Sequence, residues 1–395
     1  MFAEWERRGK GVSRDLARSK LLARLMGVDL AMLPPTILVV GSKGKGTACA
    51  YASAHLDALG LHVVSVTSPP FRTNRERIRL DGRAISNDCY SELSQRVGEA
   101  RRRLPSQSAG YLSPTGAFLA AGLALAVEKE ADALVIEEGL GGRSDDVSML
   151  KAAVVAVTAI FEEHIGVIGS NVAEIADDLL GVVGHRTRCV ITLPQSEPVD
   201  RVISRHAHAQ RVPVETIQCG VQYAVIDPVA ANARLGVRAA EVLATLLEPS
   251  RTISATTDTR IPSLPGRRSF HRSAQGQLVA VDASIDPSGV AGALSWCDRV
   301  LEPPDLVLAC FPSTKRAAEC FSILRGRRVI PVVLSVDHLD FIAADAPGPL
   351  VSPSKAFREA AFSNGVVLCV GTMSFIGEVL DWLDVSTDDW WPVSR

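Results

Sequence analysis

The chain has 395 residues, of which 47% are hydrophobic, 22% are charged and 5% are aromatic. This composition excludes disordered, collagen-like and coiled-coil proteins and suits a layered α/β protein of two or three domains. A formal charge of −2 offers no basic field for nucleic acid, and no hydrophobic run reaches the roughly 18 residues of a membrane span. The charged segment Met1–Lys10 does not resemble a secretory signal, and none of the eight cysteines forms a C-x-x-C pair. We therefore expect a cytoplasmic protein with reduced thiols.

Short β-branched runs alternate with longer Ala- and Leu-rich stretches in the first part of the chain. Such alternation with fully apolar strands predicts a mainly parallel sheet covered by helices on both faces. The predicted strands are Thr36–Val40, His62–Val66, Ala133–Ile136, Ala153–Thr158 and Cys189–Thr192. The predicted helices are Thr47–Leu59, Ala117–Lys129 and Asn171–Val183.

A second, shorter α/β series follows the Ser-, Thr- and Pro-rich stretch Pro249–Pro265, which is the best candidate for a linker. Its predicted strands are Leu278–Val281, Leu306–Cys310, Val329–Leu334 and Val366–Val370. Its predicted helices are Ser288–Val300, Lys315–Leu324, Lys355–Phe362 and Phe375–Leu383. We therefore predict two α/β domains, residues 1–262 and residues 263–395.

A glycine-rich loop, Gly41-Ser42-Lys43-Gly44-Lys45-Gly46-Thr47, follows the first strand and opens the next helix. Glycines let backbone N–H groups approach an anion closely, and the helix N-terminus adds a partial positive charge. Lys45 would neutralise β- and γ-phosphates, and the Thr47 hydroxyl would bind Mg²⁺ or phosphate. The loop departs from the standard P-loop because Gly46 separates the lysine from the threonine.

Two other interpretations of this loop remain open. Gly41, Gly44 and Gly46 resemble a dinucleotide-binding loop, which would indicate an NAD-linked oxidoreductase. Two lysines would be unusual there, and the next strand, at Val64–Thr67, ends without the acidic residue that holds a ribose. The loop would otherwise be a glycine-rich turn without a ligand.

The loop with its extra glycine resembles that of folylpolyglutamate synthases and dihydrofolate synthases, which belong to the Mur ligase superfamily. Further similarities follow in chain order: Thr67-Ser68-Pro69, Glu76–Arg79 with Gly82, Glu137-Glu138-Gly139-Leu140-Gly141-Gly142-Arg143 with Asp145, His164, Asn232, Leu264–Arg267, Asp282 and Val370–Thr372. The longest of these is similar to the family's E-V-G-L-G-G-R-x-D. The resemblance implies an ATP-binding Mur ligase-like central domain in residues 1–262 and a smaller Rossmann-like ligase domain in residues 263–395.

The resemblance also implies a reaction, in which ATP phosphorylates a carboxylate and an amine then displaces the phosphate. The partners would be small molecules, a carboxylic acid and an amine such as an amino acid, and the cofactors ATP and Mg²⁺. By the resemblance, the metal ligands are Ser68, Glu137 and His164, joined by Thr47 of the loop. Lys45, Glu137 and His164 form the implied catalytic set.

Three more residues are implied to hold the nucleotide. Asn232 would pair with the adenine, Asp282 would accept from the ribose, and Arg267 would reach the phosphates across the cleft between the domains. Each also has a plain structural interpretation: a helix N-cap for Asn232, a strand-end turn for Asp282 and a surface charge for Arg267.

Several positions depart from the family pattern. The family's carbamylated lysine, fifteen residues after the metal histidine, is Leu179 here, with Asp177 and Asp178 beside it. The histidine associated with the incoming glutamate is Ile285, the glutamate of P-T-x-F-E is Phe118, and S-P-H reads Ser68-Pro69-Pro70. Because substrate positions change more than phosphate positions, we predict a ligase for a specialised, non-folate substrate. The alternative is a catalytically weak nucleotide-binding homologue that acts as a subunit or regulator.

Overall fold

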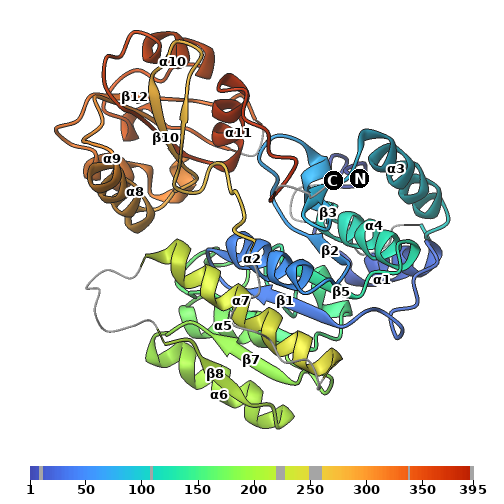
Figure 1. Cartoon of the computed structure of the whole chain (residues 1–395). Helices are drawn as coiled ribbons and strands as arrows, with labels where there is room; N and C mark the ends of the chain where they lie inside the picture. Colours follow the sequence, from blue (N-terminus) through green and yellow to red (C-terminus); the bar gives the residue numbers. More distant parts are fainter. Residues whose placement is uncertain (9–11, 107–109, 219–226, 249–259, 337–338, 392–395) are drawn as a thin grey trace. The chain divides into compact units, whose positions relative to one another are not determined.

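The computed structural model describes the chain apart from residues 9–11, 107–109, 219–226, 249–259, 337–338 and 392–395. Contacts divide the chain into two compact units (Figure 1). Unit 1 comprises Met1–Ser68, Arg75–Pro262 and Asp389–Arg395, and unit 2 comprises Pro69–Asn74 and Ser263–Asp388. The sequence-based division at residue 262 therefore assigns residues 69–74 and the C-terminal tail differently. Most of the expected linker, residues 249–259, lies outside the described residues.

Unit 1 is built on an eight-stranded sheet in the order β4-β3-β2-β5-β1-β6-β7-β8. The strands are β1 Thr36–Val40, β2 Val63–Val66, β3 Ile78–Leu80, β4 Arg83–Ala84, β5 Ala133–Glu137, β6 Val154–Val157, β7 Cys189–Thr192 and β8 Val214–Thr216. The six strands from β2 to β8 in this order pair in parallel, whereas β3 and β4 extend one edge with antiparallel pairing. Strands β3, β4 and β8 are not among the strands predicted from the sequence.

Helices cover both faces of this sheet, as hydrophobic strands require. They are α1 Leu16–Leu25, α2 Lys45–Ala58, α3 Asn87–Arg102, α4 Pro114–Glu128, α5 Val172–Leu180, α6 Glu197–Gln210 and α7 Pro228–Leu247. Helices α2 and α7 pack side by side on one face (Figure 1). Residues of α1, α3, α4, α5 and α6 share one hydrophobic core with the other face.

Local sequence signals set where these helices begin. The Ser113 hydroxyl accepts a hydrogen bond from the Gly116 N–H, and Pro114 occupies the first position of α4, so the helix starts three residues before the predicted Ala117. Asn171 caps α5 by accepting from the N–H of Glu174. Helix α2 begins at Lys45, two residues before the predicted start, so that Lys45 lies in its first turn.

Unit 2 has a five-stranded sheet in the order β12-β11-β13-β10-β9. The elements are β9 Ser269–Arg272, β10 Leu278–Asp282, α8 Pro287–Val300, β11 Leu306–Cys310, α9 Ala317–Ile323, β12 Val329–Pro331, α10 Pro353–Ala360, β13 Val367–Gly371 and α11 Met373–Trp382. Only β9 pairs antiparallel, and separate hydrophobic clusters cover the two faces, one with α10 and α11 and the other with α8 and α9. The predicted α/β fold, with a large, mainly parallel sheet and a second smaller one, is confirmed.

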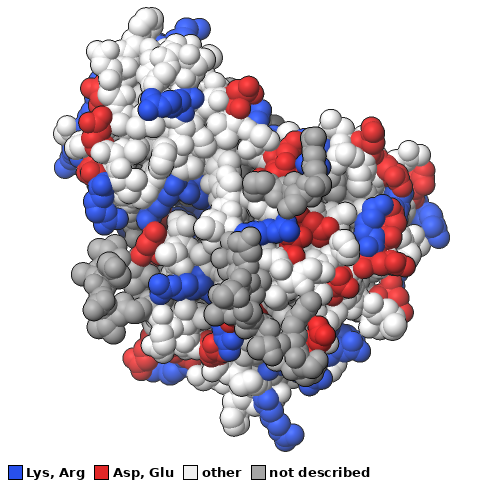
Figure 2. Space-filling model, in the orientation of Figure 1, with Lys and Arg blue, Asp and Glu red and all other residues white. Residues whose placement is uncertain are grey.

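The charges on the surface shown in Figure 2 are mixed in sign, and most of the described cysteines are buried. On the face that Figure 2 shows, basic and acidic side chains are interspersed. Of the seven cysteines among the described residues, six are buried. Among the described residues, none of the helices combines the length and the hydrophobicity that crossing a bilayer requires.

Candidate active site

Four parallel strands bring the predicted site segments of unit 1 to one edge of the sheet. Strands β2, β5, β1 and β6 are neighbours, and open α/β sheets bind ligands at the carboxyl ends of their strands. Glu137, the last residue of β5, is in register with Val39, and Val40 is in register with Val157. Ser68, Glu137, the glycine-rich loop and the segment after β6 are therefore adjacent at this edge.

The glycine-rich loop is shaped by two glycines that no other residue could replace without strain. Gly41 has φ +132° and Gly44 has φ +87°. A Cβ would stand 2.3 Å from the Thr158 hydroxyl oxygen at Gly41, and 2.1 Å from the Asn232 amide nitrogen at Gly44. Gly44 is also the N-cap of α2 and provides no side-chain cap, so the first N–H groups of the helix remain available to an anion.

Side chains of the loop tie it to the segment after β6. The Ser42 hydroxyl donates to the Phe161 carbonyl (3.2 Å) and accepts from the Phe161 N–H (3.1 Å). The Lys43 ammonium lies 5.9 Å from the centroid of the Phe161 ring. Thr47 is buried in the first turn of α2. The loop is thus held in place before any ligand binds.

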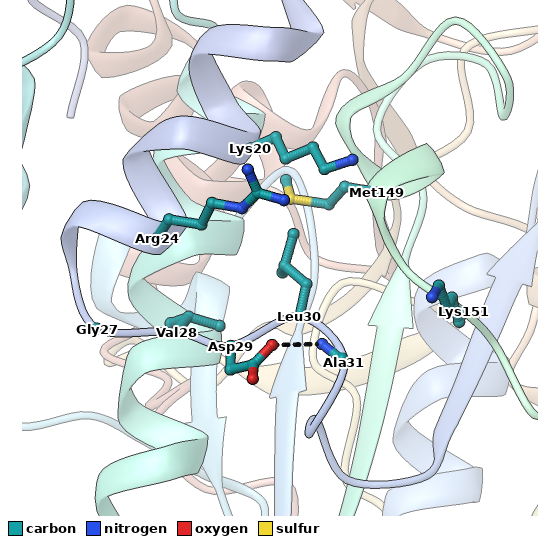
Figure 3. Close-up of a pocket in the computed structure, with 9 residues that line it drawn as sticks. All are labelled: Lys20, Arg24, Gly27, Val28, Asp29, Leu30, Ala31, Met149 and Lys151. Atoms are coloured by element: carbon teal, nitrogen blue, oxygen red, sulfur yellow. Dashed lines mark hydrogen bonds between the residues drawn. The ribbon is translucent and has the colours of Figure 1, made fainter.

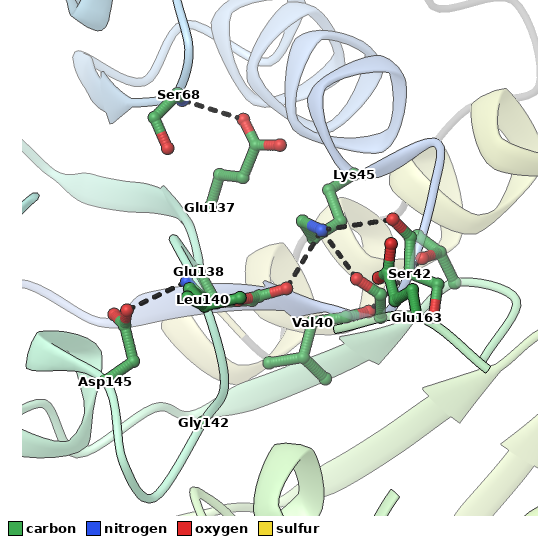
Figure 4. Close-up of polar contacts among 12 residues, drawn as sticks. Val40, Ser42, Lys45, Ser68, Glu137, Glu138, Leu140, Gly142, Asp145 and Glu163 are labelled. Carbon is green, nitrogen blue, oxygen red and sulfur yellow. Dashed lines mark hydrogen bonds and ion pairs between the residues drawn. The ribbon is translucent and has the colours of Figure 1, made fainter. Parts of the chain in front are cut away.

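Lys45 is the central charge of the site (Figure 4). Its Nζ donates to the carbonyls of Gly41 (2.6 Å) and Ser42 (3.4 Å) and lies 2.9 Å from Oε1 of Glu138. Burial alone would lower the pKa of Lys45, but Glu138, Glu137 and Glu163 together hold this pKa above its usual value. The ammonium is therefore protonated at neutral pH.

Glu137 is the last residue of β5 and Glu138 follows it, with the two side chains pointing in different directions as the alternation of an extended backbone requires. Oε2 of Glu137 accepts a hydrogen bond of 3.0 Å from the backbone N–H of Ser68, whereas Glu138 turns to Lys45 (Figure 4). Burial raises the pKa of Glu138 to about 7, against the opposing effect of Lys45. Glu138 is part of the motif identified in the sequence, where the family has a valine, but no role for it was predicted.

The metal-ligand candidates are three oxygen donors, Thr47 in the first turn of α2 and Ser68 and Glu137 at neighbouring strand ends, and the imidazole of His164. Thr47, Ser68 and Glu137 suit Mg²⁺, which prefers hard oxygen ligands and retains several waters. The His164 ring, at a residue with φ +50°, lies 3.8 Å from the Glu163 carboxylate. Among the described residues, no group of three His, Cys, Asp or Glu side chains is arranged to hold a metal by itself. A metal bound here would therefore need further ligands from phosphate and water.

Asn232 lies against the loop, in the second turn of α7. Its side-chain N–H donates to the Pro228 carbonyl (2.6 Å), while its Oδ1 is buried and has no hydrogen-bond partner among the described residues. The N-cap of α7 is Asp227, which accepts from the Val229 N–H, so Asn232 is not the cap. An unpaired buried carbonyl oxygen costs free energy unless a ligand donates to it.

The position of the family's lysine is part of the hydrophobic core. Leu179 is 2% exposed and packs with the α5 side of the sheet. Asp178 accepts hydrogen bonds from the backbone N–H groups of Gly142 (2.9 Å) and Ser144 (3.2 Å). Asp177 pairs with Arg143, Arg205 and His206. Both aspartates are therefore already engaged by the protein.

The residue that replaces the motif glutamate lies in an aromatic cluster. Phe118 is buried with its ring centroid 5.7 Å from that of Phe2 and 6.3 Å from that of Tyr90. The Arg77 guanidinium lies 4.9 Å from the Phe118 centroid, and burial lowers the pKa of Arg77 to about 10. The side chain at the position of the motif glutamate is therefore an apolar ring, and the Arg77 guanidinium lies beside it.

Arg267 and Asp282 belong to unit 2. The Arg267 guanidinium lies 5.6 Å from the Phe71 ring centroid, and Asp282, the last residue of β10, lies 3.6 Å from the Nε of Arg268. Ile285 is half-buried before α8, and its carbonyl accepts from the Cys320 thiol. These residues share one end of the second sheet.

A pocket of about 490 Å³ lies elsewhere in unit 1 (Figure 3). Its lining includes three basic side chains, Lys20, Arg24 and Lys151, and the hydrophobic side chains of Leu30 and Met149. Leu30 precedes β1 and Lys151 precedes β6, so this pocket lies toward the amino ends of the strands, away from Lys45.

Comparison with known proteins confirms the resemblance to folylpolyglutamate synthases. Folylpolyglutamate synthase of Arabidopsis thaliana is 30% identical over 207 residues, which are 49% of this chain and 34% of the relative. Dihydrofolate synthase/folylpolyglutamate synthase of Bacillus subtilis (strain 168) is 27% identical over 208 residues, 52% of this chain and 48% of the relative. The chain thus matches half or less of the length of these relatives. No protein-family profile matches the chain.

The fold extends the similarity to nearly the whole chain. The structure of Mycobacterium tuberculosis folylpolyglutamate synthase with ADP and AMPPCP has a TM-score of 0.75 and 18% identity, covering 94% of this chain and 96% of that one. The chain therefore has the fold of folylpolyglutamate synthases.

Proposed function

We propose that the chain is an ATP-dependent, ADP-forming ligase that joins a carboxylic acid to an amine. The observation that carries the proposal is the Gly44 loop, with its left-handed glycine, uncapped helix N-terminus and Lys45. This geometry suits the phosphates of a nucleotide. The fold of enzymes solved with ADP and an ATP analogue supports the same ligand.

The residues present suit both the phosphates and the adenine of ATP. Lys45 would neutralise charge on the β- and γ-phosphates, and the first N–H groups of α2 would bind phosphate oxygens. The unpaired Oδ1 of Asn232 would accept a hydrogen bond from the adenine amino group. By the resemblance, Asp282 stays the candidate for the ribose and Arg267 for the phosphates. A Mg²⁺ held by Thr47, Ser68, Glu137 and His164 would offset phosphate charge.

The reaction would proceed in two displacements. An oxygen of the substrate carboxylate attacks the γ-phosphorus, the bond to the β-phosphate oxygen breaks, and ADP leaves. The amine nitrogen then attacks the acyl phosphate carbonyl, phosphate leaves with the C–O bond electrons, and the nitrogen loses a proton to form the amide. Such chemistry depends mainly on positioning and positive charge, which Lys45 and the loop N–H groups would supply.

The acid would differ from folate. Phe118, packed against Phe2 and beneath Arg77, replaces a glutamate of the family motif, and Ile285 replaces a histidine. Both changes remove polar groups, so a substrate whose own polar groups need those partners would lose hydrogen bonds in this site and bind less tightly. The changes support a specialised acid, a different amine, or both.

The test is ATP turnover with pools of acids and amines. ADP and phosphate release that requires both an acid and an amine supports the ligase. Lys45→Ala should remove about 2–4 kcal/mol of transition-state stabilisation and lower the rate of turnover accordingly. Near-normal turnover in Lys45→Ala, with an unchanged melting temperature, would remove the phosphate-loop assignment.

A second candidate is a nucleotide-binding homologue with little ligase activity, acting as a subunit or regulator. The observation that favours it is Leu179, which is embedded in the hydrophobic core where the family has a functional lysine. ATP binding without acid- and amine-dependent ADP release from any pool would favour this candidate over the ligase.

A further inference from the structure

Lys45 is paired before any nucleotide arrives. Two loop carbonyls and the Glu138 carboxylate surround its ammonium, and Glu138 is the one that carries a charge at 2.9 Å. An ammonium has three N–H donors, so these three acceptors account for its hydrogen-bonding capacity. A phosphate oxygen can approach Lys45 only by sharing or replacing one of them.

Glu138 depends on Lys45 in return. Its side chain is 3% exposed, and its Oε2 is buried without a hydrogen-bond partner among the described residues. A buried carboxylate is costly unless an opposite charge faces it. The other charged groups that act on Glu138 are Asp145 and Glu137, which are both acidic. Lys45 is therefore its principal counter-ion.

The charge at position 138 is a feature of this chain. The corresponding residue of the family motif is a valine, which carries no charge. Phosphate oxygens brought to Lys45 would meet the negative field of Glu138, in an environment of low dielectric where like charges repel strongly.

We propose that Glu138 is the resting partner of Lys45, which the phosphates of the nucleotide displace, so that Glu138 lowers the affinity of the chain for ATP. The inference rests on the proposed nucleotide-binding function. It makes Glu138 a residue that sets nucleotide affinity without contacting the reacting atoms. Removing its charge should strengthen nucleotide binding, the reverse of what is expected for a group that holds Lys45 in its working position.

The experiment is calorimetric titration of the full chain with AMPPCP and Mg²⁺. Two variants are compared with the wild type: Glu138→Gln, which keeps the shape, and Glu138→Val, which restores the family residue. The matched control is Glu128→Gln, which makes the same charge change at an exposed carboxylate of α4 that pairs with Arg96 (3.0 Å). We expect both Glu138 variants to bind at least about tenfold more tightly. The control should bind like the wild type.

The possible results distinguish a failure of this inference from a failure of the proposed nucleotide-binding function. Wild-type binding with equal or weaker binding in folded Glu138→Gln overturns the inference and leaves the nucleotide site intact. No binding by the folded wild type or by either folded variant overturns both. Melting temperatures establish folding, and if Glu138→Val unfolds, Glu138→Gln decides alone.

Discussion

The side-chain amide of Asn232 lies directly against the Cα of Gly44, so that a Cβ at this position would be 2.1 Å from the Asn232 Nδ2 atom. The contact joins the start of α2 to the second turn of α7, two helices that pack along their length. It places the candidate adenine residue beside the candidate phosphate loop. The absence of a side chain at position 44 is therefore a requirement of the site.

Gly44→Ala should abolish nucleotide binding. The left-handed backbone costs about 1–2 kcal/mol with a Cβ, and the contact with Asn232 forces the loop to shift in addition. Gly60→Ala is the matched control, because Gly60 has φ +79° but open space around its Cα. Titration with AMPPCP should show normal binding in Gly60→Ala. Equal losses in the two variants would mean that backbone strain alone is responsible.

Glu137→Gln and His164→Ala should each raise the Mg²⁺ concentration needed for half-maximal ATP turnover. A carboxylate and an imidazole at adjoining strand ends would share one metal with the γ-phosphate, and each ligand lost weakens that metal. The Mg²⁺ dependence of turnover measures the effect. A structure with bound nucleotide in which neither side chain comes within one water of a metal would contradict the assignment.

Bicarbonate should not stimulate ATP turnover. Carbamylation needs a lysine amine, and Leu179 occupies that position inside the core. Leu179→Lys should therefore destabilise the protein instead of restoring a ligand, because it buries a charge among apolar side chains. Turnover is measured with and without added bicarbonate, alongside the melting temperature. Stimulation of the wild type would point to carbamylation of a different lysine.

Asp178→Asn should reduce ATP turnover without changing its Mg²⁺ dependence. Asp178 accepts from the N–H groups of Gly142 and Ser144, so the variant loosens the loop that follows Glu137 and Glu138. Asp177→Asn, one residue away, should leave turnover unchanged because its partners are Arg143, Arg205 and His206. A shifted Mg²⁺ dependence in Asp178→Asn alone would instead identify Asp178 as a metal ligand.

Asp177 should also stabilise the fold in a pH-dependent way. Burial raises its pKa, but hydrogen bonds from His206 and Arg143 outweigh burial and hold the pKa at about 2, below the usual 3.8. The stabilisation is therefore complete above about pH 4 and is lost as the pH falls through 2. After solvent screening it amounts to about 1 kcal/mol, or about 2 °C in melting temperature. The melting difference between the wild type and Asp177→Asn should be constant from pH 7 to pH 5 and shrink below pH 4.

Sequence alone determined the strand–loop–helix order and most of the central strands. Five-residue apolar runs such as Thr36–Val40 and Leu306–Cys310 are strands over those same residues, since a buried parallel strand is hydrophobic along its whole length. Short edge strands such as Arg83–Ala84 could not be predicted, because pairing with a neighbour, and not local pattern, makes them strands. Helices α2 and α4 begin two and three residues before their predicted starts, because caps and backbone geometry determine where a helix begins.

Only the tertiary structure decided which charges meet. The motifs identified Lys45, Glu137 and Ser68, and parallel strand order accounts for their meeting at one sheet edge. The Lys45–Glu138 pair and the Asn232–Gly44 contact depend on packing between segments distant in the chain, which no local pattern records. The same reason explains Asp178. Its helix position gives a direction for the side chain, but the Gly142 N–H that donates to its carboxylate is placed only when the loop after β5 packs against α5.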